Sequence, residues 1–173
     1  MQTTNINLYT WGYRETKTYI AVPLFVLGNI IMPQVCHLIP KGGMMLLPIY
    51  FFTLIGAYKF GWKVGIMTAA LSPIVNSALF GMPLPSALPA ILLKSVLLAM
   101  AAGYMAHKYR KVTILLLLAT VLAYQILGTL GEWAMTGNFY LAMQDFRIGI
   151  PGMLLQTLGG FAFIKYLIRR QFR

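Results

Sequence analysis

Residues 37–65 read HLIPKGGMMLLPIYFFTLIGAYKFGWKVG. A mostly apolar run over 44–62 follows a Pro-Lys-Gly-Gly segment and ends at Lys59 and Lys63. A helix of about 20 mostly apolar residues crosses a hydrocarbon layer roughly 30 Å thick. The stretch therefore predicts a membrane-spanning helix that begins after a glycine-rich loop and ends in a cationic turn.

The composition of the whole chain indicates a membrane protein. Of its 173 residues, 59% are hydrophobic and 10% are charged, whereas soluble domains carry roughly a quarter charged residues. The apolar runs predict an all-α bundle of six spans in a single domain, 1–173, after an interfacial segment at 1–17. The expected spans are 18–38, 44–62, 64–81, 86–107, 112–135 and 146–168.

The lysines and arginines are distributed unevenly between the two sides of this bundle. If the N-terminus is cytoplasmic, eleven of the fourteen lie in inside segments, and only Lys41 and Arg147 lie in outside loops. This is the asymmetry of the positive-inside rule. It places both termini in the cytoplasm and explains the net charge of +11 without a nucleic-acid partner.

One charged residue lies deep in an expected span. Lys94 is eight residues into the fourth span, about 12 Å from its outer end at 1.5 Å per residue. A lysine at such depth costs about 2.5–3.5 kcal/mol on insertion scales, so it needs a cavity or a partner. Glu132 or an acidic group on a ligand could supply that partner, and a structural ion pair or snorkelling to the surface is the alternative.

Other polar and aromatic residues gather toward the outer side. Amide side chains occur in four more spans, and loop 136–147 is long enough to act as a lid. The three acidic residues, Glu15, Glu132 and Asp145, form no plausible catalytic dyad, and motifs for phosphate binding, zinc proteases or serine hydrolases are missing. We therefore expect no enzyme activity and no resident cofactor.

Prolines and small residues punctuate the spans. Prolines inside spans break helices where a cavity or a neighbouring helix satisfies the freed carbonyls, so they suggest a pocket or packing kinks. Small residues at a spacing of four predict close helix contacts. The prolines are Pro23, Pro33, Pro48, Pro73 and Pro151, and the small pairs are Gly65 with Ala69, Ala99 with Gly103, and Ala102 with Ala106.

The middle of the chain resembles a known transporter family. Gly42-Gly43, Leu47-Pro48, Gly56, Lys63-Val64-Gly65 and Asn76, within residues 38–107, are similar to the substrate-binding S components of energy-coupling factor (ECF) transporters for vitamins and other micronutrients. The resemblance implies capture of one small molecule near the external face of a bacterial or archaeal cytoplasmic membrane. Loops 38–44, 81–86 and 136–147 would form the gate.

The resemblance also implies partners and a binding site. An S component works with a membrane-embedded T component and two cytoplasmic ATPases, which hydrolyse ATP for it. The family commonly carries two alanines four residues apart in the first span, and they dock to the T component. At that spacing this chain has Ala21 and Phe25. The candidate substrate-binding residues are Asn29, Cys36, His37, Lys41, Asn76, Lys94, Gln125, Glu132, Trp133, Asn138, Tyr140 and Gln156.

Three alternatives remain open from the sequence. The chain has the size and span number of a structural protein of the cell-wall elongation (rod-shape) machinery, and an intramembrane enzyme is a third class. Cys36 and His37, with Met44 and Met45 across the loop, could contact a transition metal or a metallocofactor. A cationic Lys94 would favour a ligand with an anionic group, and the nearby aromatic residues would suit a planar ring.

Overall fold

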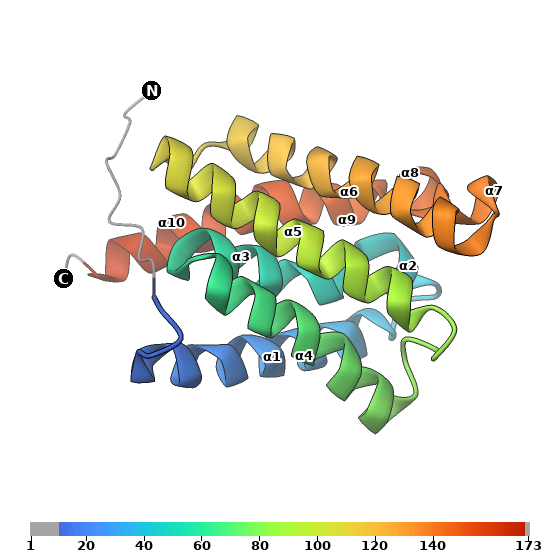
Figure 1. Cartoon of the computed structure of the whole chain (residues 1–173), viewed down its shortest axis with the longest axis horizontal. Helices are drawn as coiled ribbons and strands as arrows, with labels where there is room; N and C mark the ends of the chain where they lie inside the picture. Colours follow the sequence, from blue (N-terminus) through green and yellow to red (C-terminus); the bar gives the residue numbers. More distant parts are fainter. Residues whose placement is uncertain (1–10, 172–173) are drawn as a thin grey trace.

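The structure, a computed structural model, describes residues 11–171, with the backbone alone for 169–171. Residues 1–10 of the expected interfacial segment, the side chains of Arg169 and Arg170, and Arg173 lie outside the described residues. The described chain is helical and contains no β-strand. Figure 1 shows its long helices lying side by side along one axis.

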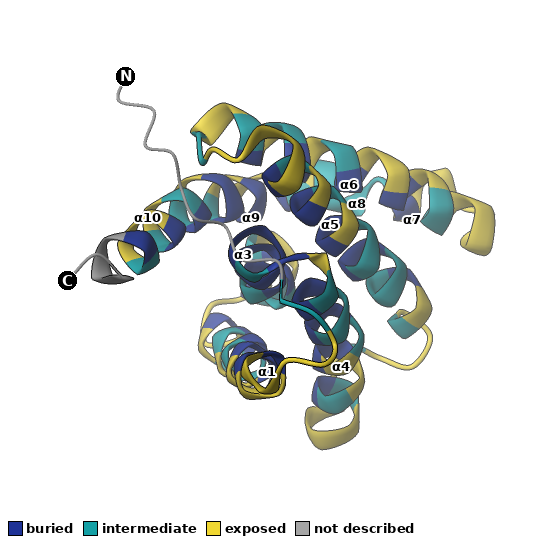
Figure 2. Ribbon diagram, turned by 60° about the vertical axis from the view of Figure 1, so that its left-hand side comes forward, coloured by how far each residue is buried: buried dark blue, intermediate teal, exposed yellow. Residues whose placement is uncertain are grey.

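Four of the six expected spans are continuous helices. Each is long and apolar enough to cross a membrane, and these are the four such helices in residues 11–171. They are α1 (Thr16–Cys36), α4 (Trp62–Phe80), α5 (Leu88–Tyr109) and α6 (Ile114–Thr136). Figure 2 shows that their buried surfaces face the neighbouring helices, while the exposed surfaces face outward.

The second and sixth expected spans are built from shorter pieces. The second region contains α2 (Gly42–Leu46), a short 3-10 turn η1 (Pro48–Tyr50) and α3 (Phe51–Phe60). After α7 (Phe139–Ala142), the sixth region contains α8 (Gln144–Ile148), α9 (Ile150–Leu154), the π-helical turn η2 (Leu155–Gly159) and α10 (Gly160–Gln171). The second region is interrupted at Leu47, and the sixth at Gly149, whereas α9, η2 and α10 follow one another without a gap and form one helix with a π-helical turn.

The breaks follow from the proline positions and from the backbone. Pro48 and Pro151 both fall at the first turn of a new helical piece, where a missing N–H is tolerated. Leu47, just before Pro48, is buried in a left-handed conformation with φ 47°, which costs a non-glycine residue about 1–2 kcal/mol. By contrast, α1 continues through Pro23 and Pro33, and α4 continues through Pro73.

Small residues bring α3, α4 and α5 together, as their spacing predicts. A Cβ added to Gly65 would lie 2.8 Å from Ala57 Cα and 3.1 Å from Ala99 Cβ. A Cβ on Gly103 would lie 2.8 Å from Trp62 Cα at the start of α4. These close approaches pack the core where lipid supplies no hydrophobic drive.

We expect Gly65→Ala to destabilise the protein by about 1–3 kcal/mol, because the added methyl group overpacks three closely spaced helices. Thermal unfolding in detergent measures the effect. Ala78→Val, at an exposed position of the same helix, is the control and should change stability by less than about 0.5 kcal/mol. Equal melting temperatures for the two variants would contradict the close packing.

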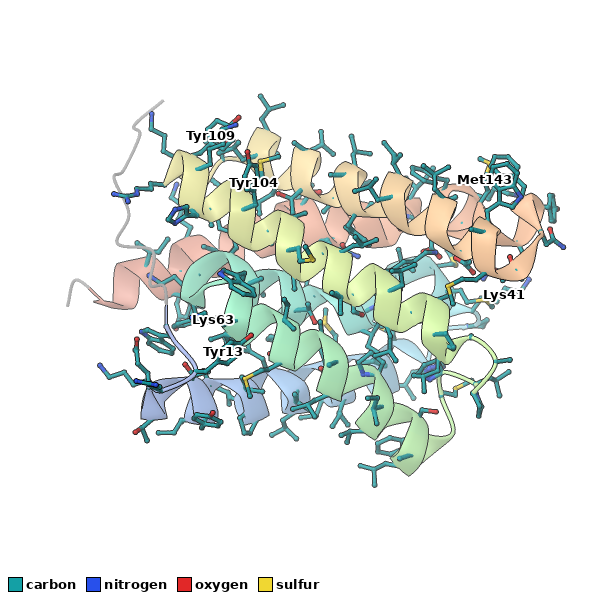
Figure 3. The ribbon with its side chains drawn as sticks, viewed as in Figure 1. Tyr13, Lys41, Lys63, Tyr104, Tyr109 and Met143 are labelled. Carbon is teal, nitrogen blue, oxygen red and sulfur yellow. The ribbon has the colours of Figure 1, made fainter. Side chains whose placement is uncertain are left out.

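Charged and aromatic groups separate the two ends of the molecule. Figure 3 places Tyr13, Lys63 and Tyr104 toward one end, and Lys41 and Met143 at the other. Lys63 Nζ lies 5.1 Å from the Tyr13 ring centroid, an arrangement that suits a membrane interface. We call the end that holds Lys41 the lysine-poor end.

Candidate functional site

An ion triad joins three helices in the bundle. Lys94 Nζ, from α5, lies 2.5 Å from Glu132 Oε2 on α6 and 2.8 Å from Asp145 Oδ2 on α8. Lys94 is only 4% exposed, and the two carboxylates are 15% and 14% exposed. The ammonium therefore points into the protein. Of the partners left open by the sequence, Glu132 is present, the alternative of an ion pair within the fold is found, and snorkelling is wrong.

The second carboxylate was not predicted as a partner. The sequence places Asp145 in an external loop and finds no pairing among the acidic residues, but the structure brings Glu132 and Asp145 onto one ammonium. α7 and α8 return the chain over the end of α6, so residues 13 positions apart meet. The signal for Asp145 in the sequence is its position in the longest of the loops expected outside.

Gly128 positions the lysine against α6. A Cβ at residue 128 would lie 2.6 Å from Lys94 Cγ, so a larger residue there would push the aliphatic stem aside. Gly128 lies between the buried Gln125 and Thr129 along α6, and Glu132 follows one turn later. One face of α6 thus carries an amide, a hydroxyl and a carboxylate in succession.

Five buried polar side-chain atoms have no hydrogen-bond partner in the described part of the chain. They are both amide atoms of Gln125, Nε2 of Gln156, Oγ1 of Thr129 and Oγ of Ser95. Buried polar groups in proteins are nearly always paired, and an unpaired one costs about 1–3 kcal/mol. These atoms are therefore the least satisfied polar groups of the described core.

The 3-10 turn η1 and the π-helical turn η2 both contact α6. Gln156 lies in the π-helical turn η2 and accepts a hydrogen bond from the Tyr124 hydroxyl of α6 at 3.0 Å. The Tyr124 ring lies 5.5 Å, centroid to centroid, from the ring of Tyr50 in η1. π-Helical turns inside α-helices occur often at functional sites.

Short helices cover the site at the lysine-poor end. Gln144 Nε2 of α8 contacts Met44 Sδ of α2 at 3.0 Å. The Arg147 guanidinium lies 3.8 Å from the Tyr140 ring centroid. Asp145, which follows Gln144 directly, makes the ion pair with Lys94. The cover is thus bonded to α2 on one side and to the buried lysine on the other.

Two predicted residues already have partners away from the triad. The Asn29 amide nitrogen donates to Thr53 Oγ1 and to Ser72 Oγ, each at 3.0 Å, and its oxygen accepts from the Phe52 backbone N–H. These bonds tie α1 to the start of α3 and to α4. Asn76 Oδ1 accepts from Gln34 Nε2 at 3.4 Å, which also joins α4 to α1.

The remaining predicted residues lie near the lysine-poor end and do not join the triad. Asn138 caps α7 by accepting from the Leu141 N–H, and Trp133 and Tyr140 are exposed. Cys36 is buried, whereas the neighbouring His37 and the loop residue Lys41 are exposed. Among residues 11–171 no group of three or more His, Cys, Asp or Glu residues is placed to hold a metal ion.

The site is thus composed of a buried ion triad, five unpaired polar atoms and two tyrosine rings under a cover of short helices. These groups are the candidate functional site of the described part of the chain. Comparison of the chain with protein-family models, with curated proteins and with solved structures finds no match.

Proposed function

We propose that this chain is the substrate-binding subunit of an ECF-type importer that captures a vitamin or related micronutrient. It would span a bacterial or archaeal cytoplasmic membrane six times, with both termini inside. A T component and two cytoplasmic ATPases would supply docking and ATP hydrolysis. The resemblance of residues 38–107 to the S components supports the family, and the buried polar groups around Lys94 support the role.

The unpaired atoms of Gln125 and Gln156 carry this proposal. Keeping five buried polar atoms without partners destabilises the empty protein, since each costs about 1–3 kcal/mol. A purely structural bundle would gain stability by replacing them with apolar side chains. A protein that binds a solute keeps them, because the solute satisfies them.

The location of the site suits capture from outside. The cover that contains Gln144 and Asp145, and that contacts Met44 of α2, lies over the lysine-poor end, which the positive-inside rule assigns to the external side. A lid at that end can admit a solute from the medium. Delivery to the cytoplasm then needs a movement driven by the partner subunits.

The test is to look for the solute itself. Protein purified in mild detergent should retain a stoichiometric small organic molecule, detected by native mass spectrometry as a mass increment that organic solvent releases. A panel of vitamins and their precursors should contain at least one compound that raises the melting temperature, since binding to the native state alone stabilises it. Neither a bound molecule nor any stabilising compound would contradict the proposal and favour a structural role.

A further inference from the structure

We propose that the end of the bundle opposite Lys41 is a binding surface for anionic phospholipids, whose headgroup phosphates contact Lys63 and Lys108. We call it the lysine-rich end, and Figure 3 places Lys63, Tyr13, Tyr104 and Tyr109 there. The proposal concerns a partner of the bundle itself and does not depend on any solute of the proposed importer.

The positive charge at the lysine-rich end is not neutralised by carboxylate side chains. The whole chain has three acidic residues, and two of them are paired with Lys94 at the other end. The third, Glu15, accepts a hydrogen bond from the Gly12 N–H at 3.1 Å. Seven exposed or half-buried cations of the lysine-rich end make no ion pair within the described part of the chain: Arg14, Lys17, Lys63, Lys108, Arg110, Lys111 and Lys165. Most of their counter-charge must therefore come from outside the chain.

The distribution of these cations fits a lipid leaflet. They come from the start of α1, the start of α4, the end of α5, the connection to α6 and from α10, and Figure 1 shows these segments grouped at one end of the molecule. In Figure 2, the helices α1, α4, α5 and α10 surround α3. A protein partner or a nucleic acid would contact one face of the bundle, whereas a leaflet contacts its whole perimeter at one depth.

Aromatic rings hold Lys63 in place at the start of α4. Its Nζ lies 5.1 Å from the ring centroid of Tyr13 and 5.8 Å from that of Trp62, and both rings are more than two-fifths exposed. The Trp11 N–H donates to the Phe60 carbonyl at 3.1 Å, which ties the segment before α1 to α3. A ring attracts the ammonium without removing its charge. A lysine held in this way loses less freedom when it contacts a phosphate.

Lys108 is held in the same manner in the last turn of α5. Its Nζ lies 5.4 Å from the ring centroid of Tyr104 and 5.7 Å from that of Tyr109, and it donates to the Tyr104 hydroxyl at 3.1 Å. Because an ammonium has three N–H donors, two remain for a phosphate. Exposed tyrosines beside cations are typical of the headgroup region of a membrane.

The experiment compares lipids that differ in headgroup charge. The protein is placed in nanodiscs of phosphatidylcholine alone or of an equal mixture with phosphatidylglycerol, and the readouts are its melting temperature and the lipids it retains in native mass spectrometry. We expect the mixture to raise the melting temperature and the retained lipid to be mainly phosphatidylglycerol. Lys63→Gln and Lys108→Gln should each weaken this preference roughly five-fold, as expected for the loss of one lysine contact at an anionic leaflet.

The control is Lys41→Gln, which removes the same charge from an exposed position at the lysine-poor end and should leave the preference within about two-fold of the parent. An equal loss in this variant would overturn the assignment, because net charge alone would then set the preference. Inorganic phosphate or glycerophosphate, added at matched ionic strength, should not stabilise the protein in phosphatidylcholine. If either does so as strongly as phosphatidylglycerol, the surface binds free phosphate and the lipid proposal is wrong.

The parent protein decides the proposal even where a variant fails to fold. Equal melting temperatures and equal retention of the two lipids would overturn it, and the charge would then be left for an acidic protein partner. A preference that disappears at high salt supports it, because screening weakens contacts between exposed charges. The absence of any bound solute would contradict the proposed importer and leave this result unchanged.

Discussion

Replacing Lys94 with methionine is expected to lower the free energy of unfolding by about 3–5 kcal/mol, the loss typical when one partner of a buried ion pair is removed. Glu132 and Asp145 would then face each other without the ammonium that both contact. The cover would also lose its bond to α5, since Asp145 belongs to α8. Unfolding in detergent, followed by circular dichroism, measures the loss.

Two further variants separate charge from packing. Lys17→Met removes an exposed lysine of α1 and should change stability by less than about 0.5 kcal/mol. The triple variant Lys94→Met, Glu132→Gln, Asp145→Asn removes all three charges, so it should recover most of the lost stability. If the Lys94→Met protein is as stable as the parent, the triad is not formed in the detergent-solubilised protein.

The four long helices could be predicted from the sequence because their signal is local. Each is an apolar run of sufficient length, and the expected 18–38, 64–81, 86–107 and 112–135 agree with α1, α4, α5 and α6 to within two residues at each end. The broken regions could not be predicted in the same way. Proline removes a backbone donor wherever it occurs, yet Pro23 lies inside a helix while Pro48 begins a new one. The packing of neighbouring residues decides whether a proline stays inside a helix or begins a new one.

The candidate site, too, could be predicted from local signals only in part. Depth along a span identified Lys94, Gln125 and Gln156, because polar groups are costly in lipid wherever they occur. Depth did not reveal which polar groups bond to each other. Asn29 is as deep as the others, but three hydrogen bonds to α3 and α4 satisfy it. Asp145 reaches the lysine only because two short helices turn the chain back.

Asn29 and Gln125 are both fully buried amides, and their replacement by apolar residues should have opposite effects on the empty protein. Asn29→Leu removes three hydrogen bonds and leaves the Phe52 N–H without its acceptor, so we expect a loss of about 1.5–4 kcal/mol. Gln125→Met removes two buried atoms that have no partner in the described chain, so we expect a gain of about 1–3 kcal/mol.

The gain in Gln125→Met should come with a loss of binding. The parent protein, once loaded with its co-purified molecule, should unfold at a higher temperature than when empty, whereas the variant should show no such difference and retain no molecule. This trade of function for stability is expected where a polar group is kept for a ligand. Paired melting curves of loaded and emptied protein test it, with Leu122→Met as the control. If Gln125→Met instead loses stability as Asn29→Leu does, the Gln125 amide is bonded within the fold, and the solute-binding site loses its main support.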